Sequence, residues 1–318
     1  MKGPEGAPAE RSGGGSDSEA GPGASRTAGE SRSTAIFLMC AACICFSLCD
    51  ASAKWLNRTF DPLMTVWARY AFNVLAVSIF LNPITTPGIA RTNRPGLQLL
   101  RSSILVACTG LNFFALQHLQ LTQSMAIQFA MPLIVALLAG PVLGEWIGPR
   151  RFLAIAVGFC GVLVVTRPFG GALHPASLLV VGATILYAVY ALVTRTLAAH
   201  DKSSTTVFYS GIVGVLLMTP VLPSVWMTPP SLLHWALLVG LGVFAAMGHW
   251  LLVLAHARAP APILSPFIYT QLVWMGGLGY LVFGDLPDGW TLVGAAIVIA
   301  SGLYLLTSER QARAKDHV

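Results

Sequence analysis

The sequence predicts an all-α integral membrane protein with ten transmembrane helices, arranged as two inverted five-helix repeats. Three observations lead to this fold class. The chain of 318 residues is 55% hydrophobic and only 10% charged, with a mean hydropathy of +0.70. Its apolar residues form long uninterrupted stretches, and its basic residues gather in alternate connections between them. Soluble domains carry about 25% charged residues, so an ordinary cytosolic enzyme, a nucleic-acid binder and a disordered protein are excluded.

The beginning of the chain differs from the rest. Residues 1–33 are rich in Gly, Ser, Ala, Pro and Glu and contain no apolar run. A segment of this composition cannot bury enough apolar surface to order itself. We therefore expect residues 1–33 to form a disordered cytoplasmic tail and not a cleaved signal peptide.

Apolar stretches of about 17 to 23 residues follow, each long enough to cross a bilayer. They lie at 34–54, 63–81, 98–117, 122–143, 151–167, 177–197, 204–222, 232–254, 262–283 and 290–307. The strands of a membrane barrel would be shorter and would alternate apolar with polar residues. The connections are too short for a soluble domain, and residues 308–318 are expected to form a cytoplasmic tail.

Basic side chains predict how the helices are oriented. With the N-terminus inside, 15 of the 19 Lys and Arg residues fall in the tails and cytoplasmic connections, Arg101 among them. Only Lys54, Arg58 and Arg167 fall outside, and Arg69 lies within the second span. Because cytoplasmic loops are enriched in Lys and Arg, this split favours ten spans with both termini in the cytoplasm. The net charge of +6 is then a sign of topology and does not indicate an acidic partner.

The sequence contains no pattern typical of a metal or nucleotide site. All six cysteines fall in apolar runs, and the pair Cys40 and Cys43 has neither a second pair nor a histidine nearby. They are interpreted as small apolar helix residues. A Walker-type phosphate loop is absent from the sequence as well. We expect no cofactor and no ATP hydrolysis.

The two halves of the chain resemble each other. In each half a span ends in Gly followed by an acidic residue, and the next helix contains two further glycines. The corresponding residues are Gly144, Glu145, Gly158 and Gly161 in the first half and Gly284, Asp285, Gly294 and Gly302 in the second. Five spans per repeat is an odd number, so repeats at 34–167 and 177–307 would enter the membrane in opposite orientations. Inverted repeats place a substrate site near the midplane, between halves that can rock.

Four segments carry a family likeness. They are Phe46-Ser-Leu-Cys-Asp50-Ala-Ser-Ala-Lys54, Trp67-Ala-Arg69-Tyr-Ala-Phe72, Gln128-Phe-Ala-Met-Pro132-Leu, and Ala261-Pro-Ile-Leu-Ser-Pro-Phe267-Ile-Tyr269 with the later Phe283-Gly-Asp285-Leu-Pro287-Asp288. Over about residues 34–308 the chain resembles the drug/metabolite transporter superfamily, specifically the EamA family of ten-helix bacterial carriers. This resemblance implies a central cavity lined mainly by the first, third, fourth, sixth, eighth and ninth helices.

The resemblance also suggests a substrate. The fourth span and the Phe-Gly-Asp-x-Pro-Asp turn are similar to carriers for S-adenosylmethionine uptake. The resemblance therefore implies a secondary transporter of the bacterial inner membrane that takes up S-adenosylmethionine by alternating access. Riboflavin uptake and export of amino acids or other metabolites are the alternatives. The expected partners are a small-molecule substrate and the lipid bilayer, without nucleic acid, and a homodimer stays open.

Other classes of protein fit the sequence less well. A membrane-embedded enzyme that modifies lipids would need clustered carboxylates or histidines at the cytoplasmic interface, and the close acidic pair Asp285 and Asp288 falls on the outer side. A channel or a partner without transport activity would not need the repeat. We therefore do not expect an enzyme.

Ionisable side chains well inside a span are functional candidates, because a charge there costs about 3 kcal/mol or more; three are singled out. Asp50 is expected to bind a proton or a cationic group, or else to pair with Lys54 one helical turn away. Arg69 would hold a substrate carboxylate or act on Asp50, or else bridge the first two helices. His249 would transfer protons, or else bond to a neighbouring helix.

A set of amide and aromatic side chains on the central helices is expected to bind substrate. These residues are Gln128, Tyr269, Gln271, Trp274, Asn112 and Tyr187. Polar groups in lipid need partners, which a ligand or an adjacent helix can supply. Pro132, Pro262 and Pro266 are expected to break or kink the fourth and ninth spans. Glu145 and Asp285 are expected to accept N–H groups at the helix starts that follow them.

Overall fold

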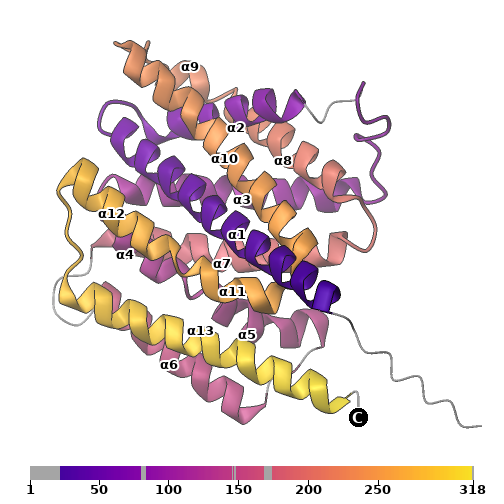
Figure 1. The fold of residues 1–318 in the computed structure, drawn as a ribbon. Coiled ribbons are helices and arrows are strands. Elements are labelled where there is room, and N and C mark those ends of the chain that lie inside the picture. Colours follow the sequence, from indigo (N-terminus) through magenta and orange to yellow (C-terminus); the bar gives the residue numbers. More distant parts are fainter. Residues whose placement is uncertain (1–21, 80–83, 145, 147, 168–173, 317–318) are drawn as a thin grey trace, which may run out of the picture.

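The computed structural model describes residues 22–79, 84–144, 146, 148–167 and 174–316. This part of the chain is helical throughout and contains no strand. Its helices are α1 (Pro22–Leu56), α2 (Pro62–Ser78), α3 (Pro95–Leu116), α4 (Leu121–Gln128), α5 (Met131–Leu143), α6 (Pro149–Thr166), α7 (Pro175–Leu197), α8 (Ser203–Met218), α9 (Leu222–Val225), α10 (Leu232–Arg258), α11 (Ala261–Ile268), α12 (Gln271–Phe283) and α13 (Gly289–Asp316). Figure 1 shows that most of the long helices run side by side as a bundle.

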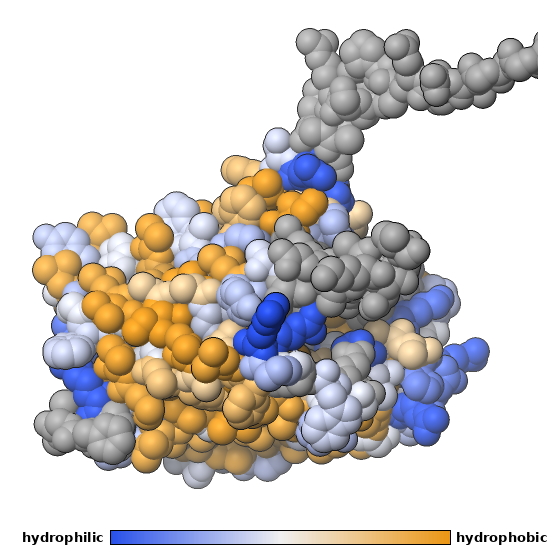
Figure 2. Space-filling model, turned by 90° about the horizontal axis from the view of Figure 1, so that it is seen from below, coloured by the Kyte–Doolittle hydropathy of each residue, from blue (hydrophilic) through white to orange (hydrophobic). Residues whose placement is uncertain are grey.

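Seven helical stretches in the described chain are long and apolar enough to cross a membrane. They are Arg32–Leu56, Pro95–Leu116, Leu121–Val142, Pro149–Thr166, Pro175–Leu197, Leu232–Arg258 and Gly289–Thr307. The other three predicted spans correspond to the 17-residue α2, the 16-residue α8 and the interrupted pair α11 and α12. Figure 2 shows a broad hydrophobic area on one face of the molecule, as a lipid-facing surface requires. The protein is therefore a multi-pass membrane protein.

The first helix begins earlier than the sequence predicts. Helix α1 starts at Pro22, so residues 22–33 are helical, ahead of the span predicted to begin at residue 34. Extending a helix that has already formed costs much less than nucleating one, and the apolar span supplies that nucleus. The rest of the predicted tail, residues 1–21, lies outside the described residues.

Prolines and glycines set several helix ends. Pro62, Pro95, Pro149 and Pro175 each occupy the first turn of a helix, where the missing N–H costs no hydrogen bond. Two glycines end matching helices in the left-handed conformation, where a Cβ would be strained. They are Gly144 after α5, with φ 75°, and Gly284 after α12, with φ 71°.

Two of the predicted spans are broken in their middle. Helix α4 ends at Gln128 and α5 begins at Met131, while α11 ends at Ile268 and α12 begins at Gln271. Each break separates an 8-residue helix from a 13-residue helix, and the second break lies 140 residues after the first. Proline removes a helical hydrogen bond and clashes with the preceding turn. The first break lies directly before Pro132, as this expectation requires, whereas Pro266 lies inside α11 and the second break follows it at residues 269 and 270.

Helices α6 and α13 pack closely along one edge of the bundle (Figure 1). A Cβ on Gly294 would lie 2.6 Å from the Gly161 carbonyl oxygen, and a Cβ on Gly161 would lie 2.9 Å from that of Gly294. Nearby, the Ser301 hydroxyl donates to the Ala154 carbonyl oxygen at 2.5 Å. With the 140-residue offset between the halves, Gly161 corresponds to Ser301 and Ala154 corresponds to Gly294. The two contacts therefore join corresponding positions of the two halves. Small residues allow this close approach of two backbones in a membrane.

Replacing Gly294 with alanine should therefore destabilise the protein. The new methyl group would be forced against backbone atoms that cannot move aside, at a cost of about 1 to 3 kcal/mol. Gly277→Ala is the control, because a Cβ at Gly277 meets nothing within 4 Å and alanine favours a helix by up to about 1 kcal/mol. Thermal unfolding of the detergent-purified variants should show a lower midpoint for Gly294→Ala alone. Equal midpoints would contradict the packing described.

Candidate functional site

A polar cluster surrounds Arg69 in the middle of α2. The Arg69 Nη1 donates to the Thr109 Oγ1 of α3 at 3.2 Å. The Tyr70 hydroxyl lies 3.0 Å from the same Thr109 oxygen, and the guanidinium lies 5.2 Å from the centre of the Tyr70 ring. Arg69 is half-buried, although its neighbours Ala68 and Tyr70 are buried. An arginine keeps its charge here, so it requires polar partners from the surrounding helices.

Two further helices bring ionisable side chains to this cluster. Asp50 of α1 and His249 of α10 both lie close enough to Arg69 to interact with it electrostatically. Both side chains are half-buried. The three predicted intramembrane charges therefore lie together, on three different helices. We name Asp50, Arg69, Thr109 and His249 the central cluster.

One hydrogen bond of the His249 side chain shows which ring nitrogen carries the hydrogen. Its Nδ1 lies 2.7 Å from the Ala245 carbonyl oxygen. A carbonyl only accepts, so Nδ1 carries the hydrogen and Nε2 is the nitrogen that can take up a second proton. The Phe46 ring of α1 packs edge-on against the imidazole at 5.1 Å. This arrangement is compatible with proton uptake at a fixed nitrogen.

The predicted amide residues form a second polar group beside the first break. The Ser124 hydroxyl and the Gln128 Nε2, both of α4, donate to the Asn112 Oδ1 of α3 at 2.9 and 3.1 Å. Gln128 Nε2 also donates to Ser124 Oγ at 3.1 Å. Asn112 and Gln128 are thus hydrogen-bonded to each other between two helices, which is the alternative to binding substrate. Both side chains still keep part of their surface accessible.

The two helix breaks meet at an aromatic contact. Phe129 follows α4 and Tyr269 follows α11, and their rings lie edge to face with centroids 4.9 Å apart. Gln271 begins α12 and is buried, with 8% of its surface exposed. Trp274 is 39% exposed on the same helix, and the described residues place no aromatic ring against it. Of this predicted set, the structure brings Tyr269 and Gln271 to the second break, and Trp274 follows one helical turn later with an exposed side chain.

The sequence interpretation missed one important residue. Arg101 was assigned to a cytoplasmic connection, but it lies in the second turn of α3 and is only 5% exposed. Its Nη2 donates to the hydroxyl of Tyr190, whose ring stacks on that of Tyr187 at 5.3 Å. The signal was present, because position 101 falls inside the predicted span 98–117. Tyr187, one of the predicted site residues, therefore stacks on Tyr190, which accepts a hydrogen bond from the buried Arg101 guanidinium.

Ion pairs join different helices at the end of the bundle where α1 stops, which we name the Lys54 end. The Lys54 Nζ donates to Asp285 Oδ2 at 2.5 Å, and Arg167 pairs with Asp288. The prediction that Asp285 accepts helix N–H groups is therefore wrong. That role belongs to Asp288, which accepts from the Thr291 N–H at 2.8 Å. The alternative that Lys54 pairs with Asp50 is also wrong, because Lys54 pairs with Asp285, which lies two residues beyond the end of α12. Glu145 lies outside the described residues.

The opposite end of the bundle is joined through Asp201, between α7 and α8, and we name it the Asp201 end. Asp201 accepts from the Asn93 N–H at 2.9 Å and from the Gln98 Nε2 at 2.8 Å. It also accepts from the Thr92 hydroxyl. The hydrogen bond from Thr92, aided by those from Asn93 and Gln98, lowers the pKa of the Asp201 carboxyl. These bonds tie the segment before α3 to the second half of the chain.

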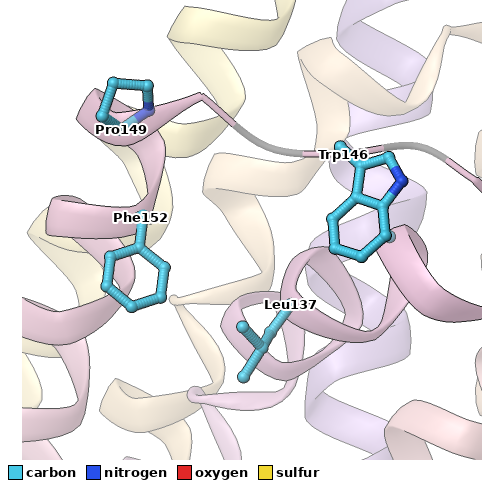
Figure 3. Close-up of a pocket in the computed structure, with 5 residues that line it drawn as sticks. Leu137, Trp146, Pro149 and Phe152 are labelled. Carbon is cyan, nitrogen blue, oxygen red and sulfur yellow. The ribbon is translucent and has the colours of Figure 1, made fainter.

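A surface pocket lies apart from all these residues. It has a volume of about 520 Å³ and is lined by Leu137, Gly140, Trp146, Pro149 and Phe152. Figure 3 shows the Trp146 and Phe152 rings on either side of it, near the start of α6. Both rings are largely exposed, at 80% and 57%. An apolar groove with exposed aromatic rings is typical of a lipid interface, so we do not assign substrate to it.

The bonds of Asp201 generate a pH-dependent prediction. A carboxyl with a lowered folded-state pKa stabilises the protein above its unfolded value of about 3.9, and this contribution is lost as the pH falls through the folded-state pKa. Asp201→Asn should lower the thermal midpoint of the purified protein at neutral pH. The difference between the variant and the wild type should shrink below about pH 4. A difference that stays constant between acid and neutral pH would contradict the ionised carboxylate.

Comparisons with known proteins agree with these features. The EamA-like transporter family matches the chain over residues 33–167 and again over 174–307. The riboflavin transporter of Vibrio cholerae is 32% identical over 275 residues, which cover 84% of this chain and 91% of the relative. The S-adenosylmethionine uptake transporter of Rickettsia bellii is 28% identical over 269 residues, with the same coverage of 84% and 91%.

Two further comparisons concern export and fold. The pseudopaline exporter of Pseudomonas aeruginosa is 25% identical over 281 residues, covering 86% of this chain and 96% of the exporter. A solved crystal structure matches with a TM-score of 0.59 at 16% identity, over 89% of this chain and 97% of the other, which shows a similar fold. These relatives indicate a metabolite transporter and not an enzyme. The predicted family is confirmed: the chain belongs to the EamA-like transporter family.

Proposed function

We propose that the protein is a secondary transporter that takes up S-adenosylmethionine across the bacterial inner membrane by alternating access. The observation that carries this proposal is the central cluster, which holds a carboxylate, a guanidinium and an imidazole on three helices. S-adenosylmethionine carries a sulfonium, an ammonium and a carboxylate group. A site with charges of both signs complements such a ligand, because each desolvated charge finds a partner of opposite sign.

The proposed mechanism requires two halves that move against each other. We infer that residues 34–167 and 177–307 are inverted repeats, with ten spans and both termini in the cytoplasm. The equal lengths of the broken helices support this, since both pairs have 8 and 13 residues. The reciprocal contacts of Gly161 with Gly294 and of Ala154 with Ser301 support it further, because a twofold relation between halves produces such pairs.

In this orientation the Lys54 end faces outward and the Asp201 end faces the cytoplasm. Lys54 and Asp285 belong to different halves, as do Gln98 and Asp201, so each end is held by a polar contact between the halves. Opening either side requires one of these contacts to break while the other persists. We propose that they alternate as the outer and inner closures of the transport cycle.

Protons could drive this cycle through the central cluster. Asp50 and His249 are the side chains of this cluster whose chemistry allows them to bind and release a proton. A substrate gradient is the alternative driving force. Uptake into proteoliposomes should rise when an inward proton gradient is imposed. An uptake rate that does not change with the gradient would contradict proton coupling.

Riboflavin is the second candidate substrate. The Vibrio cholerae relative named for it is 32% identical to this chain, and the stacked rings of Tyr187 and Tyr190 suit a flat heterocycle. Riboflavin is uncharged, however, and offers no group of opposite charge to Asp50 or Arg69. Export of an amino-acid-like metabolite is the third candidate, on the precedent of the pseudopaline exporter.

Uptake of labelled S-adenosylmethionine and riboflavin by cells that produce the protein tests the proposal. Wild-type cells should accumulate S-adenosylmethionine. Asp50→Asn and Arg69→Gln should each reduce uptake at least about tenfold, because each removes one partner of a charge pair that the bound substrate buries, which costs about 2 to 5 kcal/mol. Gln271→Ala should also reduce uptake if this buried amide of α12 contacts the substrate. Arg258→Gln is the matched control at the exposed end of α10.

Each result has a separate meaning. Uptake of riboflavin alone would select the second candidate. Uptake of neither compound would make export the better proposal. Full uptake of S-adenosylmethionine by Asp50→Asn and Arg69→Gln, at equal protein levels, would show that the central cluster is not the substrate site.

A further inference from the structure

A buried amide and a buried cation lie one helical turn apart near the beginning of α3. Gln98 is 0% exposed and Arg101 is 5% exposed. The Arg101 Nε donates to Thr194 Oγ1 of α7 at 2.7 Å, and its Nη1 donates to Ser210 Oγ of α8 at 2.6 Å. The guanidinium stacks on the Tyr190 ring at 4.4 Å from its centre. Three helices therefore enclose this pair.

The partners of Arg101 do not balance its charge. Its acceptors are three hydroxyl oxygens, those of Thr194, Ser210 and Tyr190, and the Thr206 carbonyl oxygen. No carboxylate within the described part of the chain pairs with it. Burying a charge is costly unless an opposite charge compensates it. A negatively charged ligand group would supply that compensation.

Gln98 has an unused acceptor on the same side of α3. Its Nε2 donates to Asp201 Oδ2 at 2.8 Å and to Thr206 Oγ1 at 3.3 Å. Because a carboxylate only accepts, this bond fixes which end of the amide is the oxygen. That oxygen, Oε1, is buried and has no hydrogen-bond partner among the described residues. An unsatisfied buried acceptor costs about 1 to 3 kcal/mol, which a ligand N–H group would recover.

We propose that Arg101 and Gln98 bind the α-amino-acid end of the transported metabolite. The Arg101 guanidinium takes the carboxylate and Gln98 Oε1 accepts from the ammonium group, which leaves the sulfonium to face the Asp50 carboxylate of the central cluster. The proposal rests on the proposed uptake of S-adenosylmethionine, which has such an end, and adds the residues that select it. In this structure α8 covers the pair, so the carboxylate replaces Thr206 and Ser210 as acceptors of the Arg101 Nη1 once α8 moves away.

The position of the pair gives it a place in the transport path. Thr109, which binds Arg69, lies two turns after Arg101 on the same helix. Gln98 is itself a donor to Asp201, in the contact that closes the Asp201 end. The pair thus lies between the central cluster and the proposed cytoplasmic opening. Tyr187, 39% exposed and stacked on Tyr190, extends an aromatic surface beside it for the adenine ring.

Binding to the purified protein in lipid nanodiscs tests the assignment. The probes are S-adenosylmethionine, its decarboxylated analogue, which lacks only the carboxylate, and L-methionine. The wild type should bind S-adenosylmethionine at least about tenfold more tightly than the analogue, because a site built for a polar group rejects a ligand that lacks it. Arg101→Gln should reduce this ratio to about one while affinity for the analogue stays unchanged. Arg94→Gln, at the exposed start of α3, should preserve the ratio.

The competing role for Arg101 is that of a clamp between helices. A clamp predicts that Arg101→Gln weakens both ligands equally, and that result would overturn the proposal. If Arg101→Gln does not fold, Arg101→Lys provides the measurement, since lysine keeps the charge but loses the bidentate geometry. An unchanged affinity ratio in Arg101→Lys would also overturn the proposal. Arg101-dependent binding of L-methionine without binding of S-adenosylmethionine would support the pair and contradict the proposed substrate. Binding of neither would contradict both.

Discussion

The charge of Arg69 is the constraint on which the surrounding structure depends. A guanidinium cannot be neutralised inside a membrane, so the helices that enclose it must carry polar groups at the same depth. Thr109 and Tyr70 supply hydrogen bonds, and Asp50 supplies the opposite charge. Helix packing serves this arrangement, because Gly214 and Gly242 allow α8 and α10 to lie directly against α2. The charges of Asp50 and Arg69 balance each other without a ligand, and both side chains are partly accessible. Such a cluster can exchange its internal contacts for contacts with a substrate.

The contacts at the two ends of the bundle differ in character. At the Lys54 end, Lys54 and Arg58 both lie over the Phe283 ring at 4.8 Å, in addition to the ion pairs. At the Asp201 end, one carboxylate is held by neutral donors. Bonds of both kinds involve an ionised group, which makes them stronger than bonds between neutral groups. The two ends therefore rely on different chemistry, an ion pair at one and several hydrogen bonds to a single carboxylate at the other.

Much of the fold could be predicted from the sequence, because apolar length, proline position and basic-residue bias act locally. The breaks near Pro132 and Pro266 and the family are examples. The site was harder to predict. Arg101 was misplaced because a basic residue near the end of a span looks the same whether it faces water or turns inward. Asp285 was misassigned because its partner, Lys54, lies 231 residues away, and no local pattern contains that pairing. The trio of Asp50, Arg69 and His249 was found because any charge in lipid requires an explanation.

Cross-linking the Lys54 end tests most directly whether the two halves must separate there. Cysteines at positions 54 and 285, in a background without the six native cysteines, would be joined by a short reducible bifunctional thiol reagent. The account predicts that substrate uptake falls to background once cross-linking is complete and recovers after reduction, while single-cysteine variants treated with the same reagent remain active. Undiminished uptake by the fully cross-linked protein would contradict alternating access through this end.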